Sequence, residues 1–291
     1  MQNWKTNRPI VLVVMFAILA YTWSYVCWRP ILDQIKPNLL TMKPGAIGLM
    51  MAGGFGPTAA ALLLSLAIGG FGEVRTLLAR VSRWRMGWVW YVLAVLFAPL
   101  AGLGGVAIYT ALGHNPGAVR WDHWWVIAAF YGVSVFFGPL LEETGWRGFA
   151  QPILLNRYGV FVTGMMTGTI WTFWHSPLWF AAEGSSLSGG HFSAIGLLCY
   201  WLFLTGQSIV VAWMLSRTRG SVLIAMLVHQ GMNASAVAWL FYDIATPDKP
   251  LAFQQLPVIA IWSFIVIGLV FGAMRGRVTG DAVNPSTGRH S

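Results

Sequence analysis

The sequence predicts an all-α, polytopic membrane helical bundle of about eight transmembrane helices, with both termini in the cytoplasm. Of its 291 residues, 57% are hydrophobic and only 9% carry a charge, whereas a soluble domain usually has about 25% charged residues. The mean hydropathy is +0.64, and the apolar residues are gathered into long stretches. These observations exclude a soluble domain with a large core and indicate a chain that folds in a lipid bilayer.

Eight apolar stretches are each long enough to cross a hydrocarbon core of roughly 30 Å at about 1.5 Å per residue. They cover residues 9–28, 46–70, 88–112, 124–148, 158–182, 192–216, 221–242 and 253–274. With the N-terminus inside, 13 of the Lys and Arg residues fall on cytoplasmic segments and five on outer segments, in agreement with the positive-inside rule. The net charge of +9 therefore reflects topology and gives no reason to expect nucleic acid as a partner.

The chain divides into one bundle and a short tail. Residues 1–120 supply N-terminal transmembrane helices and include a basic segment at 71–87, which fits either an amphipathic helix on an anionic leaflet or a topology signal. Residues 121–245 hold the motifs described below, and residues 246–274 form the last transmembrane helix. Residues 275–291 are a polar tail that we expect to be disordered. We expect an integral multi-pass protein of the plasma (inner) membrane.

Three of the apolar stretches carry ionisable residues, although a charge at the centre of a bilayer helix costs about 2.5–3.5 kcal/mol. In the fourth stretch Glu143 precedes Arg147 by four residues, which is the favoured order for an ion pair on one helical face. That pair leaves Glu142 as the carboxylate without a predicted partner. Such a group is suited to act as a general base.

The fifth stretch contains a single histidine, His175, four residues after Trp171. Gly164 and Gly168 lie on the same helical face, and small residues allow a neighbouring helix to approach closely. The face that carries His175 is therefore predicted to point into the bundle.

His229 and Asn233, in the seventh stretch, are also four residues apart and share a face. Each of the three motifs alone also fits a structural role: a charge cluster at a helix end, a hydrogen-bonded buried histidine, or polar contacts between membrane helices. Their depths agree, however, because Glu142 lies 16 residues before the turn at Tyr158 and His175 lies 17 residues after it. Two antiparallel helical arms would bring those two side chains level, with His229 about 15 Å from the cytoplasmic surface.

Together the motifs Glu-Glu-x-x-x-Arg, aromatic-x-x-x-His and His-x-x-x-Asn, each on a separate apolar helix, resemble the CPBP (Abi) family of intramembrane endopeptidases. These are the CAAX-processing and bacteriocin-processing proteases, and they include the Ras-converting CAAX endopeptidase. The flanking Glu-Glu-x-x-Trp-Arg-Gly, Trp-His-x-Pro and Arg-x-x-Gly-Ser-Val-Leu agree with this family. The resemblance covers residues 135–240 well and the first four stretches only in general character. Trp171 stands where the family often has Phe and preserves an aromatic wall.

The resemblance implies hydrolysis of a peptide bond within the membrane. Glu142 together with His175 would activate the attacking water. An oxyanion hole would come from His229 and Asn233, because this task needs fixed donors in a water-poor site. The supporting residues would be Glu143, Arg147 and Trp171.

The family has also been described as metal-dependent. A zinc site would use the two histidines, His175 and His229, with Glu142 or Glu143 and an open fourth position. The sequence lacks His-Glu-x-x-His, the better-known zinc helix. We favour the metal-free glutamate mechanism without a cofactor and keep zinc as the alternative.

Two other function classes use the same residues differently. A non-catalytic membrane immunity or scaffold protein would keep the fold without the reaction. A proton-coupled transporter would use buried Glu and His as a proton relay, but the inverted repeats typical of transporters are not visible here. For the protease we expect a membrane-associated peptide or lipidated protein as substrate, either prenylated or of the bacteriocin type. The sequence does not specify an oligomeric state.

Overall fold

The protein, seen here in a computed structural model that describes residues 9–36, 42–119, 121–181, 192–234 and 250–274, consists of helices, and these residues include no strand. The longer helices are α2 (Pro9–Trp28), α4 (Gly56–Val81), α5 (Trp88–Ala111), α10 (Ala194–Arg217) and α12 (Pro250–Met274). The shorter ones are α3 (Pro44–Gly54), α6 (Trp124–Ser134), α7 (Pro139–Gly145), α8 (Gln151–Leu155), α9 (Val160–Trp174) and α11 (Val222–Ala234). The predicted all-α class is confirmed. The predicted tail at 275–291 and the end of the predicted 221–242 stretch lie outside the described residues.

Four helices in the described part of the chain are long and apolar enough to cross a membrane. They are Pro9–Ile31, Gly56–Val81, Trp88–Ala111 and Ala194–Arg217. Two shorter apolar helices cover Val222–Asn233 and Pro257–Leu269. A multi-helix membrane bundle is therefore supported, while the expected count of eight spans is not confirmed.

Two of the predicted continuous stretches are broken, and the prediction of a single helix is wrong for both. The 46–70 stretch divides into α3 and α4 at Phe55, next to Pro57 in the first turn of α4. The 124–148 stretch is interrupted between Ser134 and Pro139. Proline lacks the backbone N–H that a helix interior needs, so it is favoured in a first turn and ends the segment before it.

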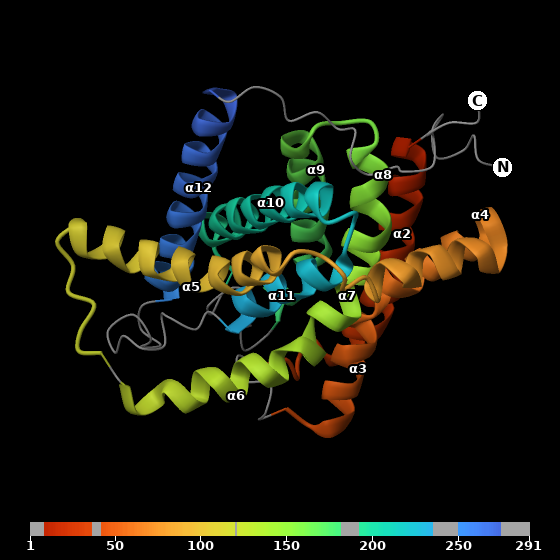
Figure 1. Cartoon of the computed structure of the whole chain (residues 1–291). Coiled ribbons are helices and arrows are strands. Elements are labelled where there is room, and N and C mark those ends of the chain that lie inside the picture. The colour runs from red at the N-terminus through yellow and green to blue at the C-terminus, as the bar shows by residue number, and fades with distance from the viewer. Residues whose placement is uncertain (1–8, 37–41, 120, 182–191, 235–249, 275–291) are drawn as a thin grey trace.

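Helix α7 lies in the interior of the bundle. It packs against α4 on one side and α11 on the other, and α11 also packs against α5. Figure 1 shows α7 and α11 near the centre, with α2 and α4 on one side and α5 and α12 on the other. The short helix that carries two of the candidate carboxylates is therefore surrounded by other helices.

Helix α9 packs along α10 at the two glycines that the sequence singled out. A Cβ added to Gly164 would run into the backbone of Ile209, and one added to Gly168 would run into the backbone of Thr205. Small residues at an interface let two helix backbones come this close. The predicted close approach is confirmed, and it fixes α9 relative to α10.

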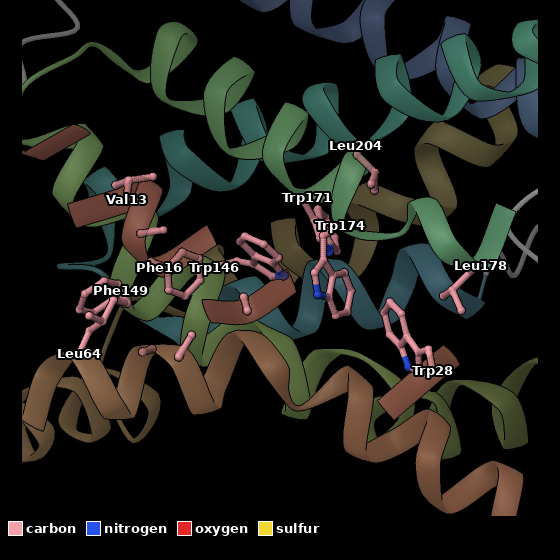
Figure 2. Packing of buried hydrophobic residues seen from close by; sticks show 14 of the residues in the cluster. Val13, Phe16, Trp28, Leu64, Trp146, Phe149, Trp171, Trp174, Leu178 and Leu204 are labelled. Carbon is pink, nitrogen blue, oxygen red and sulfur yellow. The ribbon is translucent and has the colours of Figure 1, made fainter. Parts of the chain in front are cut away.

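A cluster of buried aromatic rings joins α2 to the segments that carry the site (Figure 2). Phe16 meets Trp146 edge-on with ring centroids 5.2 Å apart, and Trp146 meets Trp174 at 5.8 Å. Trp28 lies 4.8 Å from Trp174 and donates its indole N–H to Met50 O at 3.1 Å. Buried aromatic pairs in these edge and tilted geometries add to the stability gained from area burial alone.

The basic segment predicted at 71–87 continues α4 as a helix as far as Val81. Helical geometry is interrupted at Gly69 and Gly70, and Gly70 has φ of 64°, a conformation that glycine adopts readily. Beyond this bend Leu77 is buried whereas Phe71 is exposed. The segment therefore has one face against the protein and one face free.

Candidate functional site

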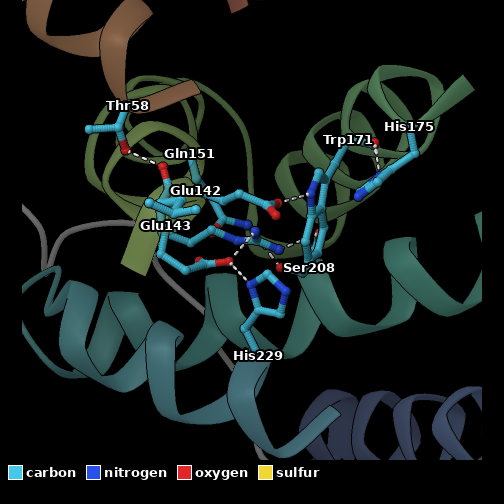
Figure 3. Close-up of polar contacts among 10 residues, drawn as sticks. Thr58, Glu142, Glu143, Gln151, Trp171, His175, Ser208 and His229 are labelled. Carbon is cyan, nitrogen blue, oxygen red and sulfur yellow. Dashed lines mark hydrogen bonds and ion pairs between the residues drawn. The ribbon is translucent and has the colours of Figure 1, made fainter. Parts of the chain in front are cut away.

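Helix α7 is held firmly against α4. The Thr58 hydroxyl donates to Leu141 O at 2.6 Å, as Figure 3 shows. A Cβ at Gly145 would overlap the backbone of Pro57, so the two helices touch there. Glu142 follows Leu141 directly and therefore sits on a fixed backbone.

Glu143 is fully buried and binds two partners through one oxygen. Its Oε1 accepts from Arg147 Nη1 at 2.8 Å and from His229 Nδ1 at 2.7 Å. The pair with Arg147 has the four-residue spacing predicted from the sequence. A carboxylate can only accept, so His229 carries its proton on Nδ1, a tautomer assigned from the hydrogen bond. His229 Nε2 is therefore the nitrogen left for chemistry.

The Arg147 guanidinium is fixed on three sides. Besides Glu143, it donates from Nη2 to Ser208 Oγ at 3.1 Å, and its Cζ lies 4.1 Å from the centroid of the Trp171 ring. A cation over an indole face is attracted by the ring quadrupole, more strongly when both are desolvated. Arg147 and Trp171 are at most 1% exposed, so each restricts the position of the other.

Trp171 holds the remaining carboxylate. Its indole Nε1 donates to Glu142 Oε2 at 2.8 Å. The same ring meets His229 edge-on, with centroids 4.9 Å apart and planes at 76°. Of the two carboxylate oxygens of Glu142, Oε2 accepts this hydrogen bond and Oε1 does not.

Three polar atoms from two helices surround Gly138. A Cβ built on this glycine would lie 3.0 Å from Asn233 Nδ2, 3.2 Å from His229 Nε2 and 3.3 Å from Glu142 Oε1. All three atoms therefore lie about one hydrogen-bond length from the region beside the Gly138 Cα that a Cβ would occupy. We call this region the Gly138 hollow. Glu142 and His229 are at most 5% exposed, whereas Asn233 is exposed.

His175 lies apart from this group. Its Nδ1 contacts Trp171 O at 2.9 Å, and in Figure 3 its ring is on the far side of Trp171 from the Glu142 carboxylate. Because a carbonyl oxygen only accepts, His175 carries a proton on Nδ1. Of the four predicted catalytic residues, the structure brings Glu142, His229 and Asn233 together, and it separates His175 from Glu142 by the indole of Trp171.

A π-turn, η5 (Trp146–Ala150), follows α7 and explains why Glu142 lies level with Trp171 of α9 and not with His175. A π-turn holds more residues per turn than an α-turn, so it advances less along the axis. The residue count predicted Glu142 level with His175, but Glu142 instead bonds Trp171, one turn earlier in α9. The Arg80 side chain on α4 donates to Gly148 O within the π-turn at 2.6 Å and so binds a carbonyl of this irregular segment.

Ser208 and Gln151 were missed by the sequence reasoning. Gln151 Nε2 donates to Ser208 O at 2.9 Å while the Ser208 hydroxyl accepts from Arg147. Both are fully buried. The available signal was the uncharged polar pair at positions 207 and 208 in an otherwise apolar stretch, because buried polar groups in a membrane usually serve a partner.

The three predicted zinc ligands are not gathered at one point. Glu142 Oε1 and His229 Nε2 approach the Gly138 hollow, whereas His175 lies beyond Trp171. Within the described residues no group of three His, Cys, Asp or Glu side chains could hold a metal ion.

Comparison with known proteins bears on the segment that carries these residues. The model of the family described as Type II CAAX prenyl endopeptidase Rce1-like matches residues 123–235. Among curated proteins, the chain is 32% identical over 105 residues to CAAX prenyl protease 2 of Methanococcus maripaludis. The matched part makes up 35% of this chain and 39% of that protein. The family match spans helices α6 to α11.

Proposed function

Residues 123–235 of this chain belong to the Rce1-like CAAX prenyl endopeptidases, the family predicted from the three motifs, and from this premise we propose that the protein is an intramembrane endopeptidase. It would hydrolyse a peptide bond in a membrane-associated peptide or lipidated protein. The matched relative is named for a prenyl protease, and a prenylated substrate is part of this proposal.

The observation that best supports the proposal is the Gly138 hollow. One carboxylate oxygen, one imidazole nitrogen and one amide nitrogen approach a common point there, each within 3.3 Å. A water molecule displaced slightly outward from that point would contact an acceptor and up to two donors. General-base hydrolysis requires this combination of an activated water beside donors for the developing oxyanion.

The buried charges balance when the cluster holds one extra proton. Glu142, Glu143 and Arg147 together carry one net negative charge, and a proton on His229 Nε2 brings the cluster to zero. A low-dielectric interior favours the neutral total, because unpaired buried charges are costly. The proposed oxyanion role requires this proton to lie on His229 Nε2 while Nδ1 stays bound to Glu143.

The reaction then follows from the position of each group. Glu142 Oε1 takes a proton from the water as its oxygen bonds to the substrate carbonyl carbon. The carbonyl π electrons move to oxygen, and this oxyanion accepts from Asn233 Nδ2 and His229 Nε2. As the C–N bond breaks, Glu142 returns the proton to the leaving amine.

His175 remains the proposed partner of Glu142 in water activation. Its donor from Nδ1 to Trp171 O leaves Nε2 as an acceptor when the ring is neutral. A His175→Gln variant with full activity would remove it from the mechanism.

We propose that no metal is needed. Glu142 and His229 already offer a base and a donor, and Glu143 is committed to Arg147 and His229. Metal-free and zinc-bound mechanisms need the same residues, so mutants cannot separate them. We expect the purified protein to lack stoichiometric zinc and to keep its activity in the presence of a strong chelator. Activity that a chelator removes and zinc restores would contradict the proposal.

We also propose a plasma-membrane protein with eight crossing segments and cytoplasmic termini. The distribution of Lys and Arg supports this orientation. In a variant whose Cys27 and Cys199 are replaced by Ser, a cysteine placed at the exposed Arg75 should react with an impermeant maleimide only after permeabilisation. A cysteine placed at the exposed Asn115 should react in intact cells. The reverse pattern would invert the topology.

The proposed activity is tested with purified protein in proteoliposomes and a CAAX-type peptide, prenylated or unmodified, with products identified by mass spectrometry. Wild type should cleave the prenylated peptide, and Glu142→Gln should lose at least about 10²-fold. Glu73→Gln, a carboxylate change on α4, is the matched control and should cleave like wild type. Equal cleavage by wild type and Glu142→Gln would refute the proposal and favour a non-catalytic role.

A further inference from the structure

The Trp171 indole is the group that fixes the direction of the Glu142 carboxylate. Its N–H donates to Oε2 at 2.8 Å, and Oε1 lies on the other side, 3.3 Å from the Cβ position in the Gly138 hollow. A carboxylate whose one oxygen is held cannot rotate freely. The bond therefore decides which oxygen faces the water.

The indole ring is itself held in place. Arg147 lies over its face at 4.1 Å, and His229 meets it edge-on at 4.9 Å. Arg147 and His229 both bind Glu143 Oε1. The indole ring thus packs against a cluster that two short ion-pair contacts hold in place. This packing restricts the direction of the Trp171 N–H.

Trp171 also orients His175, through its main chain. Its carbonyl oxygen contacts His175 Nδ1 at 2.9 Å. One residue thereby touches both members of the predicted water-activating pair, one through the indole and the other through the backbone. Phe at this position would keep the backbone contact and a ring, but it would lose the donor.

We propose that Trp171 is a positioning residue, whose indole N–H orients Glu142 and stabilises its ionised form so that Oε1 faces the Gly138 hollow. This inference rests on the proposed function. It gives the indole N–H of Trp171 a task beyond that of an aromatic ring in the wall of the site. It acts through Glu142 and contacts no reacting atom of the substrate.

The test compares Trp171→Phe with wild type in kcat, KM and pH dependence. Hydrogen bonds to charged groups contribute about 1.5–3 kcal/mol, so kcat should fall by about 10-fold to 100-fold while KM changes little. The acid limb of the pH–rate profile should move up by about one pH unit, because the ionised carboxylate loses a donor.

The matched control is Trp28→Phe. Trp28 is also buried, and it donates its N–H to a backbone acceptor, Met50 O, where Trp171 donates to the Glu142 carboxylate. Both variants lose the same ring volume, but only Trp171→Phe should move the pH profile. Because a smaller ring could also loosen the site, benzothienylalanine at position 171 provides a second variant that keeps the bicyclic shape without the N–H; it should reproduce the Trp171→Phe shift.

Unchanged kcat and pH profile in both position-171 variants would overturn the inference. An equal loss in Trp171→Phe and Trp28→Phe without a pH shift would also overturn it, since packing alone would explain the loss. If wild type cleaves no peptide, the proposed function fails, but the positioning contact is still measurable by NMR. The ¹⁵N resonance of the Trp171 indole is assigned as the one that is missing from the spectrum of Trp171→Phe. It should titrate with pH in wild type and not in Glu142→Gln. Identical titration in wild type and Glu142→Gln would refute the contact.

Discussion

Replacing Gly138 by alanine tests the centre of the proposed site directly. The added methyl would lie 3.0, 3.2 and 3.3 Å from Asn233 Nδ2, His229 Nε2 and Glu142 Oε1. The methyl group would overlap a water molecule that lies at the point where these three atoms converge. Gly138 has φ of −172° and ψ of −68°, so the effect of the change on folding is measured beside its effect on activity.

The expected magnitude follows from that overlap. Excluding or displacing the water removes general-base catalysis, which contributes about 10²-fold to 10⁴-fold, and a misplacement of about 1 Å alone can cost 10²-fold. We therefore expect kcat/KM to fall at least about 10²-fold. The thermal unfolding midpoint separates this loss of activity from a loss of folding.

The assay pairs Gly138→Ala with Gly132→Ala in the same proteoliposomes, with thermal unfolding measured on both. A Cβ at Gly132, six residues earlier, meets no atom within 4 Å, so this control should keep wild-type activity. Wild-type kcat/KM in a folded Gly138→Ala protein would refute the reasoning, because it would show that the reacting water lies elsewhere.

Three further substitutions test the framework around the hollow, by denaturant unfolding in detergent. Glu143→Gln should lower the unfolding free energy by about 3–5 kcal/mol, because it leaves the charge of Arg147 buried without its partner; a wild-type midpoint would contradict this. Gly168→Ala should destabilise by about 1–3 kcal/mol through overpacking of α9 on α10, while Gly159→Ala, with open space around its Cβ, should be neutral; equal effects would refute the close approach. Ser208→Ala should cost about 1.5–3 kcal/mol by removing one acceptor of the guanidinium, and an unchanged unfolding curve would show that this bond contributes nothing.

The sequence predicted well where hydrophobic length alone decides the outcome. The stretch 9–28 coincides with α2, and 88–112 differs from α5 by one residue at its end. Both helices have many exposed apolar residues, as expected for helices in contact with lipid. The close glycine contact of α9 also followed from its spacing.

Apolar length does not reveal a break inside a stretch. Pro139 marked the interruption before α7, but averaged hydropathy passes over one proline. The π-turn has no comparable sequence signal, so the register that sets Glu142 against Trp171 could not be derived from counting residues. The hydrogen bond between Glu143 and Arg147 could be predicted because the two residues are four apart on one helix. The bond between Glu143 and His229 could not, because 86 residues separate them.

The contact between Arg80 and the Gly148 carbonyl gives one basic residue two duties. In the proposed topology its charge helps to keep the α4–α5 connection on the cytoplasmic side, and its guanidinium donates to a peptide oxygen in the π-turn that follows α7. Replacing arginines by neutral residues is a common test of membrane orientation. A replacement of Arg80 in such a test would also remove the bond to the Gly148 carbonyl. Loss of activity in such a mutant would then reflect a disturbed π-turn. Of the arginines in the 71–87 segment, Arg75 and Arg85 are exposed and are the better positions for testing orientation alone.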